Sequence, residues 1–258
     1  MKTTYILAIA IIAIVVVASV VVYWYNTNSS KPSNVLVVGT SPDFPPYESL
    51  DSSGRYTGFD VDLMNIIAGR LGMKVEWRDM AFDVLIGSLK QGKIDAIISA
   101  MSITSVRLQE VDFSVSYYQS EYAVLKRSDS AINITQPIDM TNYKIGTQSG
   151  SQQYEYLTQW INSSQLSQDK VFLYERFDQA VLDCVNGRVD IVFCEKPFAL
   201  KMSKLQPVTT ALIWPSASPG TGIALQKGDT RLNDINSVIT DLNSTGILEA
   251  LSVAWLSG

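Results

Sequence analysis

An internal repeat constrains the fold of this 258-residue chain more than any other feature. Residues 82–99 (FDVLIGSLKQGKIDAIIS) align without a gap with residues 177–194 (FDQAVLDCVNGRVDIVFC). Each copy predicts a helix, a glycine in a left-handed turn and then a buried strand. Convergence of two helix–Gly–strand units would give a similar pattern. The four identities favour a duplicated lobe instead, and they fall at Phe82, Asp83, Gly92 and Asp95 of the first copy.

Strand-like and helix-like patterns alternate around the repeat. Residues 35–38 form a short apolar run typical of a buried strand, and apolar residues recur at helical spacing through residues 59–73. This alternation predicts an α/β fold. Open α/β sheets bind ligands beyond the carboxyl ends of their strands. If each copy of the repeat belongs to its own lobe, two such ends face each other, and a clamshell with a central cleft is expected.

A long apolar segment precedes this body. Residues 6–25 carry no charged side chain, end in Tyr23-Trp24-Tyr25 and have about the length that crosses ~30 Å of hydrocarbon. No small-x-small cleavage site follows them, which favours a membrane anchor. A cleaved signal peptide, and hence a secreted protein, is the alternative. Residues 1–33 are therefore expected to be an anchor and flexible linker, with the body outside the cell membrane.

Composition excludes several functions. The chain has no histidine, so a Ser-His-Asp triad and a His-ligated zinc site are ruled out. Its net charge is −5, and residues 1–33 contain two lysines and no acid, so the remainder is more acidic still. Such a chain is a poor binder of nucleic acid. No metal or cofactor is expected. Cys184 and Cys194 are separated by a turn and most of a strand, and we expect two free thiols, with Cys194 a candidate lining residue of the cleft.

Ordered motifs along residues 34–258 then point to a known family. The motifs are residues 41–48 (SPDFPPYE), 58–63 (GFDVDL), 95–107 (DAIISAMSITSVR), 111–114 (VDFS) with Tyr117 and Tyr118, and Gly150-Ser151. In their order and spacing the chain resembles extracellular solute-binding proteins of family 3, which feed polar amino acids to ABC importers. The resemblance implies a periplasmic-binding-protein fold of type II. It places lobe 1 at residues 34–119 and 222–258, and lobe 2 at residues 120–221.

The resemblance also assigns the groups that hold the amino-acid backbone. Arg107 stands where the family grips the α-carboxylate, and a planar guanidinium suits a carboxylate. Glu195 stands where the family usually has an aspartate that binds the α-ammonium. Ala100 and Ser102 match positions that contribute main-chain and hydroxyl contacts, and Ser99 is an additional candidate.

Further candidates surround the expected side-chain pocket. Ser151 and Gln152 begin an amphipathic stretch whose amides suit a carboxylate, and Ser151 is also a candidate helix cap. Phe44 and Phe82 match the positions whose rings flank the ligand. Ser41 and Gln148 stand where relatives carry an aspartate and a lysine, so an uncharged ligand side chain is expected.

The leading interpretation is a solute-binding protein that captures an amino acid and delivers it to ABC permease subunits, as a monomer that is not an enzyme. The first alternative is a dehydratase on the same scaffold, with Glu195 as general acid. A ligand-sensing domain of a receptor is the second alternative.

Overall fold

The computed structural model describes residues 34–257. The predicted membrane anchor at residues 6–25 lies outside these residues. Within residues 34–257, every helix is too short or too polar to span a bilayer.

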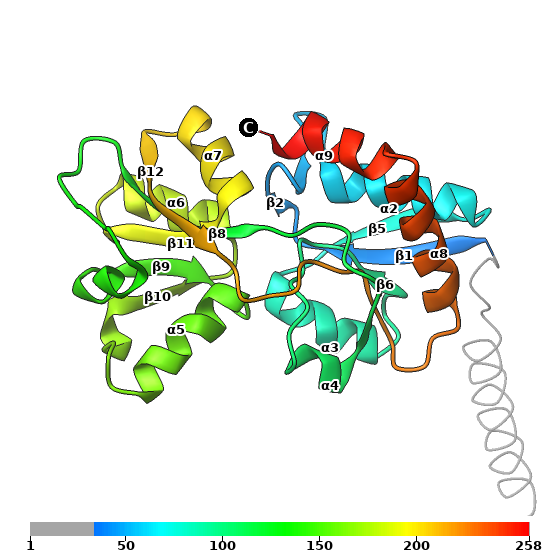
Figure 1. Ribbon diagram of the computed structural model, residues 1–258, viewed down its shortest axis with the longest axis horizontal. Helices are drawn as coiled ribbons and strands as arrows, with labels where there is room; N and C mark the ends of the chain where they lie inside the picture. The colour runs from blue at the N-terminus through cyan, green and yellow to red at the C-terminus, as the bar shows by residue number, and fades with distance from the viewer. Residues whose placement is uncertain (1–33, 258) are drawn as a thin grey trace, which may run out of the picture. The chain divides into compact units, whose positions relative to one another are not determined.

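The first of two five-stranded sheets has the order β5-β1-β6-β13-β7. Strands β1 and β6 run parallel, and β13 is antiparallel to both of its neighbours. Helices α3 and α4 lie on the opposite side of this sheet from α2 and α9 (Figure 1). The bounds are β1 Val35–Thr40, β5 Lys74–Asp79, β6 Ala96–Ile97, β7 Asp112–Phe113, β13 Ala224–Leu225, α2 Phe59–Arg70, α3 Leu85–Lys90, α4 Arg107–Glu110, α8 Arg231–Ser244 and α9 Ile247–Leu256.

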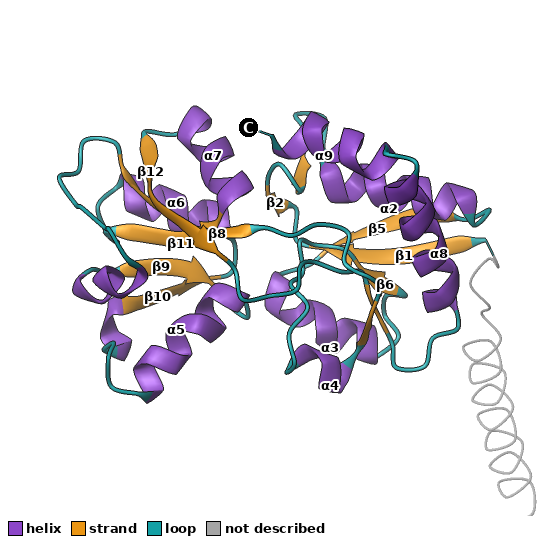
Figure 2. Cartoon of the chain, in the orientation of Figure 1, coloured by secondary structure: helices purple, strands orange, loops and turns teal. Residues whose placement is uncertain are grey.

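The second sheet has the order β10-β9-β11-β8-β12. Its first three strands are parallel, whereas β8 is antiparallel to β11 and β12. Helix α5 lies on one side of it, and α6 and α7 lie on the other (Figure 2). The bounds are β8 Glu121–Arg127, β9 Ile145–Gln148, β10 Val171–Tyr174, β11 Ile191–Glu195, β12 Val208–Pro215, α5 Gln152–Asn162, α6 Phe177–Val185 and α7 Lys196–Leu205.

The two sheets define two lobes. We call the first sheet with its helices lobe 1 and the second sheet with its helices lobe 2. The chain passes from lobe 1 to lobe 2 between β7 and β8, and returns between β12 and β13. The boundary residues inferred from the sequence, 119/120 and 221/222, stay predictions. Lobe 1 also holds a small sheet of β2 Asp43–Phe44, β3 Glu48–Leu50 and β4 Tyr56–Thr57, and the short 3₁₀ helices are η1 Phe82–Val84, η2 Pro137–Asn142 and η3 Gln168–Lys170.

Both copies of the repeat form the predicted helix, turn and strand. The first copy folds as η1, α3 and β6, and the second as α6 and β11. Gly92 and Gly187 adopt φ angles of 69° and 75°, in the left-handed region that a Cβ atom disfavours. The matching aspartates make equivalent hydrogen bonds. Asp95 accepts from the Val37 amide at 2.9 Å, and Asp190 accepts from the Lys144 amide at 2.8 Å. Each aspartate thus fixes the start of its strand against the neighbouring strand.

The cysteines are free, as expected, and both are buried. Cys194 lies in the apolar core with no exposed surface and is not among the residues that line the cavity described below, so it is not the lining residue considered from the sequence.

Candidate functional site

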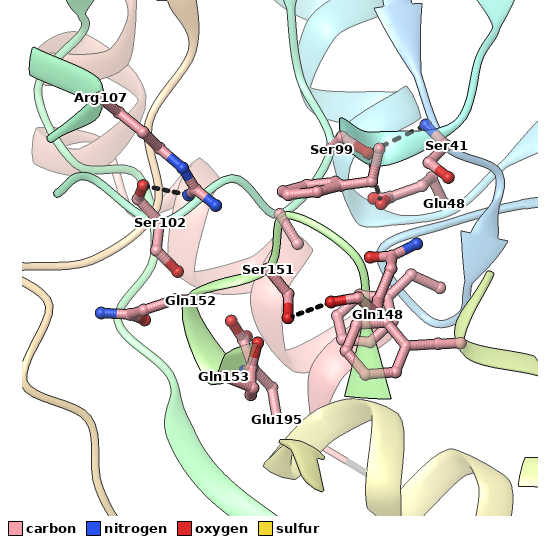
Figure 3. A pocket seen from close by; sticks show the side chains of 14 residues that line it. Ser41, Glu48, Ser99, Ser102, Arg107, Gln148, Ser151, Gln152, Gln153 and Glu195 are labelled. Carbon is pink, nitrogen blue, oxygen red and sulfur yellow. Dashed lines mark hydrogen bonds between the residues drawn. The ribbon is translucent and has the colours of Figure 1, made fainter. Parts of the chain in front are cut away.

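A cavity lies between residues of the two lobes (Figure 3). All eleven residues that the sequence assigns to ligand binding line it, although their role in binding stays a prediction. They are Ser41, Phe44, Phe82, Ser99, Ala100, Ser102, Arg107, Gln148, Ser151, Gln152 and Glu195. Three lining residues were not predicted: Glu48, Gln153 and Phe177.

Arg107 is held by main-chain oxygens from both lobes. It is the first residue of α4, and its guanidinium donates through Nη1 to the Ser102 carbonyl at 2.6 Å and through Nη2 to the Gly150 carbonyl at 2.9 Å. Its Cζ lies 5.3 Å from the centre of the Phe82 ring, in the range of a cation–π contact. Burial lowers the pKa of Arg107 to about 10, which still leaves it cationic at neutral pH. Of its five N–H groups, three make no hydrogen bond within the described part of the chain.

The start of α5 adds further donors beside Arg107. Ser151 caps this helix, as the sequence suggested, by accepting from the Tyr154 amide at 3.2 Å. The amides of the first helical turn have no partner within the helix itself. Gln153 is 3% exposed, and its Nε2 has no hydrogen-bond partner among the described residues. This end of the cavity therefore offers donors and positive charge, which suit a carboxylate.

Close approach of the two lobes at this end depends on Gly150. Its φ is 71°, and a Cβ atom there would lie 3.0 Å from the Cβ of Asp83 in lobe 1. A glycine therefore lets the segment before α5 pack directly against η1.

Glu195 ends β11 and is reached from lobe 1. Its Oε2 accepts a hydrogen bond from the Tyr47 hydroxyl at 3.1 Å. Burial raises the pKa of Glu195 to about 7, although the hydrogen bonds from Ser120 and Tyr47 and the charge of Arg107 oppose this rise. A group of opposite charge in the cavity would favour its carboxylate form. The side chain is therefore suited to an ammonium group.

A second end of the cavity is built by Ser41, Glu48 and Ser99, which group together across the pocket from Arg107 and Ser102 (Figure 3). The Ser99 hydroxyl donates to Glu48 Oε1 at 3.0 Å and accepts from the Ser41 amide at 3.0 Å. Glu48 is 1% exposed, and its Oε2 has no partner among the described residues. Burial raises the pKa of Glu48 well above its usual range, and the neighbouring Asp60 adds to the rise.

Asp60 shows what a local sequence pattern misses. A carboxylate at the start of a helix such as α2 ordinarily faces solvent and complements the helix dipole, yet Asp60 has no exposed surface. Its Oδ2 accepts from the Ala100 amide at 2.6 Å and from the Tyr117 hydroxyl at 2.9 Å. Ala100 has a φ of 44°, unusual for a residue with a Cβ atom. Asp60 thus helps to hold Ala100 in a strained conformation at the cavity wall.

The aromatic walls differ from each other. Phe82 is half-buried and lies against Arg107. Phe44 is 6% exposed and stacks on Phe198 of lobe 2, with ring centres 4.5 Å apart, while Phe177 lies 4.7 Å from it. Phe177 therefore joins the pocket through a ring contact between segments far apart in the sequence. The internal repeat carried a signal for it, because Phe177 is the counterpart of Phe82.

Comparisons with known proteins agree with this architecture. Residues 36–258 match the family described as bacterial extracellular solute-binding proteins, family 3. The chain is 28% identical to the ABC transporter arginine-binding protein 1 of Escherichia coli, over 84% of this chain and 88% of that protein. It resembles the structure of an ancestral arginine-binding protein bound to arginine with a TM-score of 0.80 and 32% identity, covering 86% of this chain and 98% of the other. A structure of such a protein bound to glutamine has a TM-score of 0.80 and 31% identity, covering 88% and 100%.

One further solved structure bears on the enzyme alternative. It is an ancestral amino-acid-binding protein named as a precursor of cyclohexadienyl dehydratase, with a TM-score of 0.76 and 30% identity over 86% of this chain and 96% of the other. The two-lobed fold, the cavity between the lobes and a family match over nearly all of the described residues lead to one conclusion: the chain belongs to the bacterial extracellular solute-binding proteins, family 3.

Proposed function

We propose that this protein binds an α-amino acid between its lobes, outside the cytoplasm, and delivers it to the permease of an ABC importer. The observation that carries the proposal is the polarity of the cavity. Donors gather at one end, around Arg107 and Gln153, and acceptors gather at the other, around Glu48. Glu195 supplies a separate buried acid. An α-amino acid has a carboxylate, an ammonium and a side chain, one group for each of these three features.

The backbone of the ligand would be held from both lobes. Arg107 of lobe 1 and the α5 start of lobe 2 receive the carboxylate, and Glu195 of lobe 2 receives the ammonium. Contacts that exist only when the lobes are together make the ligand favour the closed arrangement. Two cross-lobe bonds already join these groups, from Arg107 to Gly150 and from Tyr47 to Glu195.

The side chain of the ligand would extend towards Ser41, Glu48 and Gln148. The absence of an aspartate at Ser41 predicts an uncharged side chain, of which glutamine is the example to test. The buried and unpartnered Oε2 of Glu48 is a specific observation in favour of a different candidate, a side chain rich in donors. A guanidinium carries five N–H groups and a charge that favours the Glu48 carboxylate. We therefore propose arginine as the first ligand, which agrees with the names of the related proteins.

A binding screen tests the proposal. A ligand present at 100 times its Kd stabilises a protein by about 2.7 kcal/mol, which a thermal-shift assay detects. We expect arginine to raise the melting temperature most, with glutamine second, and acidic amino acids to have little effect. A protein that responds to no amino acid would contradict the proposed function. NMR of the recovered ligand distinguishes binding from the dehydratase alternative, in which Glu195 would act as an acid on a cyclic substrate.

Three aspects of the proposal concern the intact protein. We propose that residues 6–25 anchor it in the cell membrane, that the body lies outside the membrane, and that the protein acts as a monomer. Mass spectrometry of the mature N-terminus tests the first, because a start between residues 19 and 34 would show a cleaved, secreted form.

A further inference from the structure

Asp43 lies behind the side-chain end of the cavity and does not belong to the residues that line it. The side chain is buried and sits between two residues that do line the cavity, Ser41 and Gln148. Its Oδ1 accepts from the Ser41 hydroxyl at 2.5 Å, and its Oδ2 accepts from Gln148 Nε2 at 3.2 Å. Oδ2 also accepts from the Phe177 amide at 2.6 Å, at the start of α6.

These bonds decide what Ser41 and Gln148 can offer to a ligand. A serine hydroxyl has one hydrogen, and here Asp43 accepts it, so Ser41 Oγ presents only lone pairs to the cavity. The amide of Gln148 has two hydrogens, and they go to Asp43 and to the Glu175 carbonyl at 3.1 Å. Nothing in residues 34–257 donates a hydrogen bond to the Oε1 of Gln148. Both side chains therefore act as acceptors.

The neighbouring groups complete the same pattern. The Ser99 hydrogen goes to Glu48 Oε1, and Glu48 Oε2 is an acceptor when the carboxyl group is ionised. A cation in the cavity favours the Glu48 carboxylate, and with Glu48 ionised the side chains described at this end of the cavity present oxygen lone pairs and no donor. A ligand side chain that ends in N–H groups satisfies this wall, whereas one that brings a carbonyl oxygen to it leaves acceptors facing each other.

We infer that Asp43 is a specificity-determining residue, which acts through Ser41 and Gln148 to select ligand side chains that end in hydrogen-bond donors. The inference rests on the proposed function, because it concerns the same cavity. Asp43 belongs to lobe 1, and Gln148 and Phe177 belong to lobe 2, so this set of acceptors is assembled only when the lobes meet.

Charged groups around Asp43 are consistent with its accepting role. Arg176 Nη1 lies 4.0 Å from Asp43 Oδ1, while its Nη2 pairs with Asp79 of lobe 1 at 2.7 Å. Burial raises the pKa of Asp43 to about 6; the Ser41 and Phe177 hydrogen bonds and the Arg176 charge lower it, and Asp178 raises it. At pH 7.5 the side chain is therefore a carboxylate with no hydrogen of its own.

A purely structural role is the competing explanation. Asp43 joins the start of α6 to lobe 1, so it could stabilise closure without influencing which ligand binds. Asp79 provides the matched control, since its pair with Arg176 also crosses between the lobes but touches neither Ser41 nor Gln148. Losing a contact that only holds the lobes together weakens the binding of every ligand by the same factor. Losing a contact that sets whether the cavity wall donates or accepts hydrogen bonds changes the ratio of the Kd values of two ligands.

The experiment compares arginine with citrulline in the full chain by calorimetry at pH 7.5. Citrulline has the shape of arginine but carries a carbonyl oxygen in place of one nitrogen, and it is neutral at the side-chain end. Asp43→Asn keeps an oxygen facing the two donors of lobe 2 and turns its –NH₂ towards Ser41. The Ser41 hydrogen must then point elsewhere, and the cavity gains a donor. We expect the ratio of citrulline Kd to arginine Kd to fall by about tenfold, the effect of one mismatched buried hydrogen bond.

Controls separate the possible outcomes. Asp79→Asn should change both Kd values by the same factor and leave the ratio unaltered. In a Ser41→Ala background the Asp43→Asn substitution should no longer shift the ratio, because it acts through the serine hydroxyl. Ser41→Ala alone should weaken arginine binding, which gives a test that does not depend on the folding of the Asp43 variant.

Three results would count against the inference or the function beneath it. An Asp43→Asn protein that loses affinity for both ligands equally would show that Asp43 only supports closure. A parent protein that binds citrulline more tightly than arginine would contradict the inference that the side-chain end of the cavity presents acceptors, while leaving amino-acid binding intact. A parent protein that binds neither these ligands nor any other amino acid would overturn the proposed function itself.

Discussion

Replacing Glu195 by glutamine should stabilise the folded protein and weaken its ligand binding at the same time. Burial raises the pKa of this carboxyl group from 4.5 to about 7. Because the folded state holds the proton more tightly than the unfolded state does, the ionised group opposes folding. This cost is fully present above pH 7, decreases as the pH falls towards 4.5 and is absent below it. A shift of that size corresponds to a cost on the order of 3 kcal/mol.

The glutamine side chain keeps the shape and still accepts from Tyr47, but it does not ionise. Its amide carries a smaller burial cost of its own, so we expect a net gain of about 1–3 kcal/mol at pH 8 and a much smaller gain at pH 5. For a body of this size, 1 kcal/mol corresponds to roughly 2–4 °C in Tm. Chemical denaturation at both pH values, without ligand, measures the difference.

Ligand binding should change in the opposite direction. An ammonium group left without its carboxylate partner typically costs 2–5 kcal/mol, or roughly 30-fold or more in Kd. Glu110→Gln is the control, because that glutamate pairs with Lys90 at the surface and should alter neither property by much. Loss of stability at pH 8, or a change in stability that is the same at pH 5 and pH 8, would refute the reasoning. Unchanged amino-acid binding would place the ammonium contact elsewhere.

Three further predictions concern the same cavity. Arg107→Ala should weaken amino-acid binding by roughly 30-fold or more, and Arg107→Lys should also bind poorly because the forked geometry is lost; calorimetry that finds lysine equal to arginine would argue against a bidentate contact. Affinity should fall by up to about tenfold for each pH unit below 7, because Glu195 takes up a proton that the ligand must displace. The Glu195→Gln protein should lack this pH dependence. A parent Kd that is equal at pH 5.5 and pH 8 would be inconsistent with this role. Gly150→Ala should weaken binding of all ligands by a similar factor, because the added Cβ atom meets Asp83 across the cleft and alanine disfavours the left-handed φ of this position. X-ray scattering that shows an unchanged fraction of closed molecules would contradict this explanation.

The sequence predicted much of the fold because its signals are local. The repeat identified two helix–Gly–strand units, and both form as expected around Gly92 and Gly187. The resemblance to a family supplied eleven cavity-lining residues, from Ser41 to Glu195. These positions lie at strand ends and helix starts, where the order of elements along the chain already determines the side of the sheet they occupy.

Contacts between distant segments were not predictable in this way. Asp43 and Phe177 are 134 residues apart in sequence, and Tyr47 and Glu195 are 148 apart, yet each pair is joined by a hydrogen bond. The role of Asp60 was not predictable for a related reason, because a carboxylate near a helix start ordinarily faces solvent. Only the packing of Tyr117 and Ala100 over it shows that it is a structural acceptor.

The bond from Arg107 to the Gly150 carbonyl has a kinetic consequence. The guanidinium that is expected to receive the ligand also ties lobe 1 to the segment that precedes α5. The two lobes therefore cannot separate around a bound molecule until this tie and the neighbouring cross-lobe bonds have broken. Different ligands should then share a common limit on how fast they escape, set by the opening of the protein, and they should differ mainly in how often the protein recloses before escape is complete.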